Sequence, residues 1–213
     1  MFFTDRAHAG QLLSEAIRAA SPDLNGFIVT GLARGGVVVG APIAEEFQIP
    51  LVSLLVDDFK TPTAVYFVSG YGQILEYPHS GGKQPIFHQN GDNLKEVEGL
   101  AAFVQTVVER HLRYNNARLQ EVPRKVLLVD DGLVSGSTAL AAIQFLRAIG
   151  VEKIILAIPV LPSWFTKVEW DFKYFAWRNS TMRKPSSGIF YKAGGFGPTP
   201  DEEVSRLTET LGL

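Results

Sequence analysis

The sequence predicts an α/β fold, in which a doubly wound, mainly parallel sheet is flanked by helices and carries a hairpin excursion and a small C-terminal cap. Apolar runs alternate with segments of helical periodicity, and residues 25–57 follow the order strand, turn, helix, strand. That order is the signature of a βαβ unit with parallel strands. The 213 residues suffice for one domain with a full core. We expect residues 1–177 to form the core, with the excursion at about 60–92, and residues 178–213 to form the cap of the same domain.

The first elements follow one another at short intervals. Thr4 or Asp5 can cap a helix that ends at Ser21-Pro22 and repeats apolar residues at helical spacing. A buried strand at 25–32 then enters a glycine-rich turn. A helix at 36–47 follows, and the apolar run "LVSLLVD" at 51–57 is the second strand.

The pattern changes between Lys60 and Asp92. The stretch "AVYFVSGYGQILEY" predicts a hairpin around Gly70-Tyr71-Gly72, and the residues after it are rich in glycine and proline. Asp92 is expected to cap a long helix that runs to about Gln120.

The second half returns to alternating elements. The sequence predicts a strand at 125–131, a helix at 137–150, a strand at 153–160 and a further strand at 172–178. Within the cap, Thr199 and Glu202 form a capping box that predicts a last helix.

Composition narrows the classes of partner. With 20 Lys and Arg against 22 Asp and Glu, the formal charge is −2. This charge gives no reason to expect a nucleic-acid or membrane partner, so we expect small molecules. The absence of cysteine excludes disulfides, thiolate metal sites and a cysteine nucleophile, and the four histidines lack ligand spacing. Neither a signal peptide nor an apolar stretch of about 18 residues is present, which predicts a cytoplasmic protein.

Asp130 and Asp131 stand side by side where a buried strand is expected to end. Ligands bind just beyond the carboxyl ends of strands in open parallel sheets. The following "GLVSGST" offers backbone N–H groups and hydroxyls beside a helix N-terminus, which favours a phosphate. Two acids would repel that phosphate unless they accept bonds from neutral hydroxyls or share a cation with it. A phosphorylated ribose with magnesium meets all of these conditions.

Competing interpretations find less support in the sequence. Neither the nucleotide P-loop pattern nor the dinucleotide G-x-G-x-x-G occurs, and no G-x-S-x-G elbow surrounds Ser135. A phosphoacceptor receiver domain carries its paired acids early in the fold, whereas here they lie past the middle. A capping cluster without function would explain Asp131 or Ser135 alone but not the full run.

The run "VLLVDDGLVSGSTA" resembles the 5-phosphoribosyl-1-diphosphate (PRPP) binding motif of type I phosphoribosyltransferases. The turn "GLARGGVVVG" resembles the pyrophosphate loop of the same family. Two further stretches, "FTDRAHAGQLL" and "GIFYKAGGFGPTPDEEV", resemble the ends of a group of uncharacterised prokaryotic members.

The resemblance implies an enzyme of nucleotide salvage that transfers the 5-phosphoribosyl group of PRPP to a nucleobase or similar nitrogen acceptor and releases pyrophosphate. It implies a homodimer, a lid at residues 60–92, and catalytic Asp130 and Asp131 facing the ribose hydroxyls and magnesium. The implied 5-phosphate-binding residues are Val134, Ser135, Gly136, Ser137 and Thr138. The implied pyrophosphate-binding residues are Ala33, Arg34, Gly35 and Gly36, and the acceptor-binding candidates are Phe190, Tyr191 and Phe196.

One position departs from the family. Many relatives carry a basic pair after the second strand, whereas this chain has Asp57-Asp58, with Lys60 nearby. Negative charge there opposes a triply charged leaving group. A second interpretation therefore stays open, in which the protein is a catalytically degenerate regulatory module that binds PRPP or a nucleotide. The sequence does not identify the acceptor.

Overall fold

The computed structural model describes residues 3–32, 34–79, 85–88, 94, 96–115, 123–133, 135–163, 165, 169 and 171–179. Within these residues the chain forms two sheets and four helices, which confirms the predicted α/β class. None of the described helices is long and apolar enough to cross a membrane. The cap predicted at 178–213 lies outside the described residues, apart from the end of the last strand.

The larger sheet has five parallel strands, as a doubly wound fold requires. Their order is β2-β1-β7-β8-β9. The chain runs outward from β1 to β2 and later outward from β7 through β8 to β9, so the direction of winding switches between β1 and β7. The bounds are β1 Phe27–Leu32, β2 Leu51–Leu54, β7 Lys125–Val129, β8 Lys153–Leu161 and β9 Lys173–Asn179.

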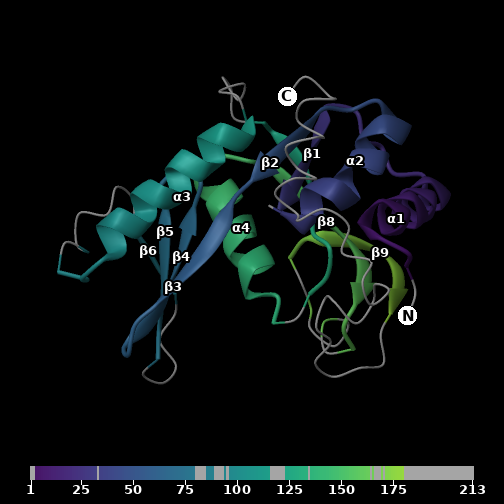
Figure 1. The fold of residues 1–213 in the computed structure, drawn as a ribbon. Helices are drawn as coiled ribbons and strands as arrows, with labels where there is room; N and C mark the ends of the chain where they lie inside the picture. The colour runs from purple at the N-terminus through teal and green to yellow at the C-terminus, as the bar shows by residue number, and fades with distance from the viewer. Residues whose placement is uncertain are drawn as a thin grey trace.

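Helices cover both faces of this sheet. α1 (Arg6–Ala20) and α2 (Gly35–Phe47) pack together on one face, and α4 (Ser137–Ala148) lies on the other (Figure 1). Along β7, Leu127 and Val129 join the core beneath α1 and α2, while Val126 and Leu128 join the core around α4. Burial on both faces explains why this strand is an uninterrupted apolar run in the sequence.

The excursion forms a second sheet, which is antiparallel and has the strand order β3-β4-β5-β6. The predicted hairpin is confirmed as β4 and β5. The single strand predicted at 51–57 is wrong, because the chain breaks at Leu55 and continues as β3. Asp57 and Asp58 therefore lie inside a strand of the second sheet, and both side chains are only partly buried. The bounds are β3 Val56–Lys60, β4 Ala64–Ser69, β5 Ile74–Pro78 and β6 Ile86–His88.

Both faces of the antiparallel sheet are packed against helices. On β4, Val65 and Phe67 contact the core around α4, whereas Ala64, Tyr66 and Val68 contact the core beneath α3. This alternation is the period-2 pattern of a strand buried on both sides. The helix α4 consequently contributes to the packing of both sheets.

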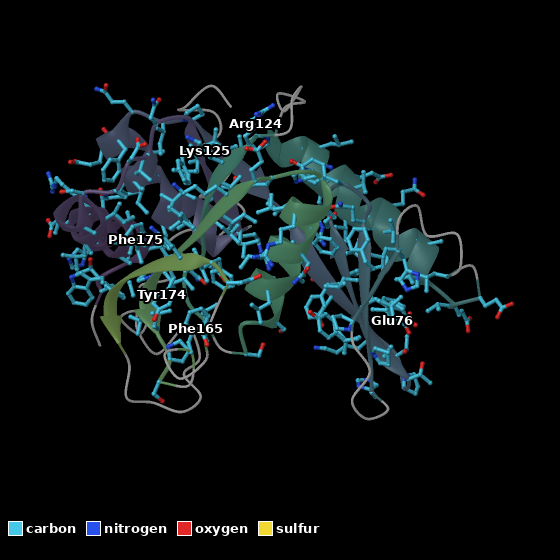
Figure 2. All side chains as sticks on the ribbon, turned by 180° about the vertical axis from the view of Figure 1, so that it is seen from behind. Glu76, Arg124, Lys125, Phe165, Tyr174 and Phe175 are labelled. Atoms are coloured by element: carbon cyan, nitrogen blue, oxygen red, sulfur yellow. The ribbon has the colours of Figure 1, made fainter. Side chains whose placement is uncertain are left out.

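The two sheets extend to opposite ends of the molecule, with α4 between them (Figure 1). From behind, Glu76 on the antiparallel sheet and Tyr174 on β9 lie far apart at these two ends (Figure 2). The loop that precedes α4 therefore lies near the middle of the molecule, within reach of both sheets.

The helix predicted from Asp92 starts later than expected. α3 spans Leu100–Asn115, residues 96–99 form turns, and Gly99 adopts a φ of 79°. A left-handed backbone interrupts a right-handed helix, so α3 cannot extend back through this glycine. Asp92 and residues 116–120 lie outside the described part of the chain.

His111 fixes α3 to the antiparallel sheet. Its side chain is buried, the Leu55 N–H donates to its Nδ1 at 3.5 Å, and the Tyr71 ring meets it edge-on with centroids 4.8 Å apart. A Cβ on Gly70 would lie 2.1 Å from His111 Cγ, so this close approach requires glycine. Burial disfavours the charged ring and lowers the pKa of His111 to about 4.

Candidate functional site

The candidate site lies at the carboxyl ends of β1 and β7. These strands are direct neighbours, with Gly31 opposite Val129. Because the winding direction switches between them, the loops that follow diverge and leave room for a ligand. The turn before α2 and the loop before α4 thus meet where the sequence predicts a site.

Two glycines bring these loops into contact. A Cβ on Gly36 would lie 2.3 Å from the Val129 carbonyl oxygen, and a Cβ on Gly35 would lie 2.2 Å from Asp131 Oδ2. Real Cβ atoms do not approach other atoms so closely, so neither position accepts a side chain without a shift of the backbone or of the Asp131 carboxylate. The glycines of the predicted pyrophosphate loop therefore lie directly against the predicted ribose-facing acids.

Asp130 and Asp131 are both half-buried at the end of β7. The Asp131 N–H donates to Asp130 Oδ1 at 2.8 Å. Burial raises the pKa of Asp130 well above its usual range, and repulsion from Asp131 raises it further, while this hydrogen bond and the charge of Arg6 act in the opposite direction. Burial and the charge of Asp131 thus make the ionised form of Asp130 unfavourable, and a cation or hydroxyl donors beside it would stabilise that form.

Arg6 is a site residue that the sequence interpretation did not include. Its Nε donates to Asp131 Oδ2 at 2.8 Å, and the two side chains are only 11% and 15% exposed. A Cβ on Gly35 would also lie 2.8 Å from Arg6 Nε, so the arginine, the acid and the glycine form one tight contact. Arg6 is the first residue of α1 and directly follows the cap Asp5, whose Oδ1 accepts from the His8 N–H. The dipeptide Asp5-Arg6 was the only part of the sequence that could have indicated this role, but nothing in two residues predicts that the arginine contacts Asp131.

The loop before α4 has the form expected of a phosphate cradle. Gly136 caps the helix with a φ of 75° and provides no capping side chain. Ser135 Oγ and Ser137 Oγ lie 2.7 Å apart, and the Ser137 N–H also reaches Ser135 Oγ at 3.3 Å. Hydroxyls and first-turn amides thus gather beside the positive end of the helix dipole. A small pocket of about 120 Å³ lies here, lined by Asp130, Gly132, Leu133, Ser135, Gly136, Thr138 and Ala139.

A larger pocket of about 480 Å³ adjoins the same loop. Ser135 and Thr138 line both pockets, so the two are neighbouring parts of one depression. The far wall of the larger pocket belongs to the antiparallel sheet. Its lining residues are Asp58, Lys60, Val65, Phe67, Tyr77, Ser135, Ser137 and Thr138.

The two acids that depart from the family pattern are both paired with cations. Asp57 accepts from Arg110 of α3, and Asp58 lies 2.9 Å from Lys60 Nζ. Neighbouring residues of a strand point to opposite faces, so Asp57 faces α3 and Asp58 faces the larger pocket. Each of the two carboxylates thus lies beside a cation.

The binding roles of the remaining predicted site residues stay predictions. Arg34 is exposed at the start of α2. Ala33, Val134, Phe190, Tyr191 and Phe196 lie outside the described residues, and their roles stay predictions.

The described residues hold no cluster of three or more His, Asp or Glu side chains that could bind a metal by themselves. Magnesium often uses only one or two carboxylates and takes its other ligands from phosphates and water. The adjacent carboxylates of Asp130 and Asp131 fit this pattern, because a cation would offset the repulsion between them.

Comparison with known proteins decides the family. A family model described as the phosphoribosyl transferase domain matches residues 6–181. The chain belongs to this phosphoribosyltransferase family. The matched range includes both loops of the site and Arg6.

Relatives and solved structures agree with this assignment. Proteins from two strains of Mycobacterium tuberculosis, provisionally named phosphoribosyl transferases, are 28% identical over 216 residues, which is 95% of this chain and 45% of theirs. The chain therefore spans about half the length of these curated relatives. The crystal structure of TT1426 from Thermus thermophilus matches with a TM-score of 0.67 and 24% identity, over 97% of both chains. A Neisseria gonorrhoeae protein with bound ppGpp matches with a TM-score of 0.50 and 16% identity, over 99% of this chain and 94% of that one. These two likenesses show that the chain shares its fold with both proteins over nearly its whole length.

Proposed function

We propose that this protein transfers the 5-phosphoribosyl group of PRPP to a nucleobase or similar nitrogen acceptor. The observation that carries the proposal is the contact between the two loops at the switch point. Across this contact the glycines of one loop lie against Val129 and Asp131, and Asp130 lines a small pocket together with Ser135 and Thr138 of the other loop. A PRPP molecule carries a diphosphate, a diol and a phosphate in that same order, and each has a matching group here.

The reaction follows from this order. The acceptor nitrogen forms a bond to C1 of the ribose while the bond from C1 to the diphosphate oxygen breaks. Pyrophosphate leaves with the electron pair, and the acceptor's proton passes to solvent or pyrophosphate. Asp130 and Asp131 stabilise the positive charge that develops on the ribose ring, and amide N–H groups near Gly35 and Gly36 donate hydrogen bonds to the oxygens of the leaving diphosphate.

Within this proposal Asp130 and Asp131 would hold magnesium together with PRPP. The ion would balance charge on the diphosphate as it leaves. Arg6 donates to Asp131 Oδ2 and so holds this carboxylate in place. Ser135, Ser137 and Thr138 would donate hydroxyls to the 5-phosphate beside the α4 N-terminus.

The Arg6–Asp131 pair also favours a second candidate, a regulatory module that binds PRPP or a nucleotide without transferring it. An acid already paired with arginine stabilises a developing cation less than a free one. A homodimer, a lid at residues 60–92, a cytoplasmic location and an acceptor site at Phe190, Tyr191 and Phe196 remain proposals that follow from the family. The activity of the complete protein is likewise a proposal, since relatives extend well beyond this chain.

The test is a calorimetric titration with PRPP, with and without magnesium, followed by pyrophosphate release upon adding acceptors. We expect magnesium-dependent binding that the Asp130→Asn/Asp131→Asn variant loses. Release that depends on an acceptor distinguishes the transferase from the regulatory module. If the wild-type protein does not bind PRPP, the transferase is wrong, and if it binds no nucleotide in the same titration either, the regulatory module is wrong as well.

A further inference from the structure

The amino edge of the parallel sheet, where its strands begin, carries a row of lysines that the proposed function does not use. β7, β8 and β9 start at Lys125, Lys153 and Lys173. Lys125 is the direct cross-strand partner of Lys153, and Lys173 is the partner of Ile155, two residues after Lys153 and so on the same face. Lysines of three neighbouring strands therefore share one face, at the edge opposite the candidate site.

This row of charges is unfavourable by itself. Like charges on directly paired strand residues repel each other and lower stability. The Nζ atoms of Lys125 and Lys153 lie 5.8 Å and 5.3 Å from the centroid of the same Phe27 ring. Lys125 Nζ also donates to the Asn25 carbonyl oxygen at 3.0 Å. These contacts hold two positive charges near each other, and a bound anion would offset the repulsion between them.

A pocket of about 220 Å³ lies beside this row, lined by the end of α4 and the starts of β8 and β9. Its basic lining residues are Arg147, Lys153 and Lys173, and its acidic ones are Glu152 and Asp171. The rest of the lining is apolar and includes Phe172. The pocket therefore offers apolar surface next to charged groups.

The ion pairs around the pocket leave two of its positive charges uncompensated. Asp171 pairs with Arg147 at 2.9 Å, and the other lining acid pairs at 3.3 Å with an arginine outside the lining. No acid in the described part of the chain forms an ion pair with Lys153 or Lys173, and both lysines are exposed. Two exposed ammonium groups beside an apolar floor suit a dianion that carries an organic part.

A phosphate monoester has these properties. It carries a charge of about −2 at neutral pH with three acceptor oxygens, and flexible lysine side chains can converge on one such group. A monocarboxylate would leave one lysine uncompensated. A nucleic acid would bring its repeated phosphates against the two acids of the lining, which repel them. The volume is below the roughly 300 Å³ at which pockets for drug-sized ligands begin, so the occupant is small.

We propose that this pocket binds a small phosphate monoester through Lys153 and Lys173, with the organic part of the ligand on the apolar floor beside Phe172. The site is separate from the one at Asp130 and Asp131. β7 joins the two edges of the sheet and has five residues, which span about 16 Å. The proposal therefore does not depend on phosphoribosyl transfer.

The test measures binding of phenyl phosphate by ligand-observed NMR, with phenol and inorganic phosphate as probes that each keep one half of the ligand. We expect phenyl phosphate to bind more tightly than either half. The double variant Lys153→Gln/Lys173→Gln should weaken it about tenfold, because two exposed ion pairs to the phosphate are lost. Lys173→Gln alone keeps the contact of Lys153 with the Phe27 ring and should show part of this loss. Thermal melting checks that each variant folds.

The measurement is repeated with PRPP and magnesium, which identify any phenyl phosphate bound before α4 by displacing it. Arg124→Gln is the matched control. Arg124 lies at the same edge (Figure 2), its side chain is 80% exposed and pairs with Glu152, and it does not line the pocket. This variant should leave binding unchanged.

Four outcomes would overturn the pocket assignment: no binding of phenyl phosphate, complete displacement by PRPP, binding of phenol as tight as that of phenyl phosphate, or an equal loss in the Arg124 variant. A single-stranded oligonucleotide that binds more tightly and is lost in the double variant would assign the lysines to nucleic acid instead. PRPP binding should be the same in the double variant and the wild type. A protein that binds phenyl phosphate through these lysines but does not bind PRPP would contradict the proposed transferase alone.

Discussion

The parallel and antiparallel sheets border the same loop but contribute to it in different ways. The parallel sheet provides strand ends, where Asp130, Asp131 and tightly packed glycines meet. The antiparallel sheet provides a face, where side chains from three strands form a wall. Strand ends present backbone amides and a few fixed acids, which suits a ligand part common to a whole family. A sheet face presents interchangeable side chains, which suits the part of a ligand that differs between relatives.

The largest effect on the strand ends of the parallel sheet is expected from the double variant Asp130→Asn/Asp131→Asn. PRPP binding that depends on magnesium should be lost and transfer abolished, and thermal melting checks that the variant is folded, because Asp131→Asn also removes the carboxylate that pairs with Arg6. The raised pKa of Asp130 means that the unfolded chain ionises more readily, so this carboxyl lowers stability once the pH rises above its ordinary value. Asp130→Asn alone should therefore raise the melting temperature at neutral pH. Normal turnover in the double variant would contradict the assignment of the acids.

Arg6→Gln should remove the ion pair that joins the start of α1 to Asp131, where Gly35 also lies. It leaves Asp131 without its cation beside a second acid, and loss of one partner of a largely buried pair costs about 3–5 kcal/mol. Arg18→Gln is the control, since this arginine of the same helix pairs with Glu46 at 58% and 38% exposure, and such pairs contribute about 0–1 kcal/mol. Urea denaturation measures both values. Equal losses of unfolding free energy in the two variants would show that the Arg6–Asp131 pair is worth no more than an exposed ion pair.

Acid should weaken the packing of α3 on the antiparallel sheet. His111 has a folded pKa of about 4, whereas the unfolded chain binds a proton near its ordinary value of 6.5. The contribution of His111 to stability is therefore constant above about pH 6.5 and falls between pH 6.5 and 4, by about 3 kcal/mol for a shift of this size. Comparing the pH dependence of unfolding with that of His111→Asn isolates this contribution. A variant with the same slope would assign the acid sensitivity to other groups.

Thr138→Ala should have the smallest effect. Its hydroxyl lies where both pockets meet, and removing one donor to a bound phosphate should weaken PRPP binding by about 1–3 kcal/mol. Calorimetry measures this change, with Thr106→Ala on the exposed face of α3 as the control. Unchanged affinity would mean that backbone amides alone hold the phosphate.

The parallel sheet could be predicted from sequence because each of its signals is local. A strand buried on both faces reads as an apolar run, and "DDGLVSGST" follows such a run directly. Asp130 and the serine loop were therefore placed correctly at a strand end. Arg6 was missed because it is separated from Asp131 by 125 positions, and one arginine at a helix start has many possible partners.

The antiparallel sheet was harder to predict because its pairing depends on helices elsewhere in the chain. The β4–β5 hairpin was visible, since alternation around a glycine turn is local. The break at Leu55 was not visible, because the apolar run 51–56 continues without interruption from β2 into the first residue of β3, and the two strands join different sheets. The opposite orientations of Asp57 and Asp58 follow from that break, so the sequence alone suggested two unbalanced charges.

The position of α4 between the sheets also has a consequence for synthesis of the protein. β4 and β5 leave the ribosome well before α4, yet their Val65 and Phe67 face is covered only once that helix has formed. Until then the nascent hairpin presents an uncovered apolar surface, a condition in which chains aggregate or recruit chaperones. Ribosome-bound chains that end before α4 should therefore be more sensitive to proteases in this hairpin than chains that include it.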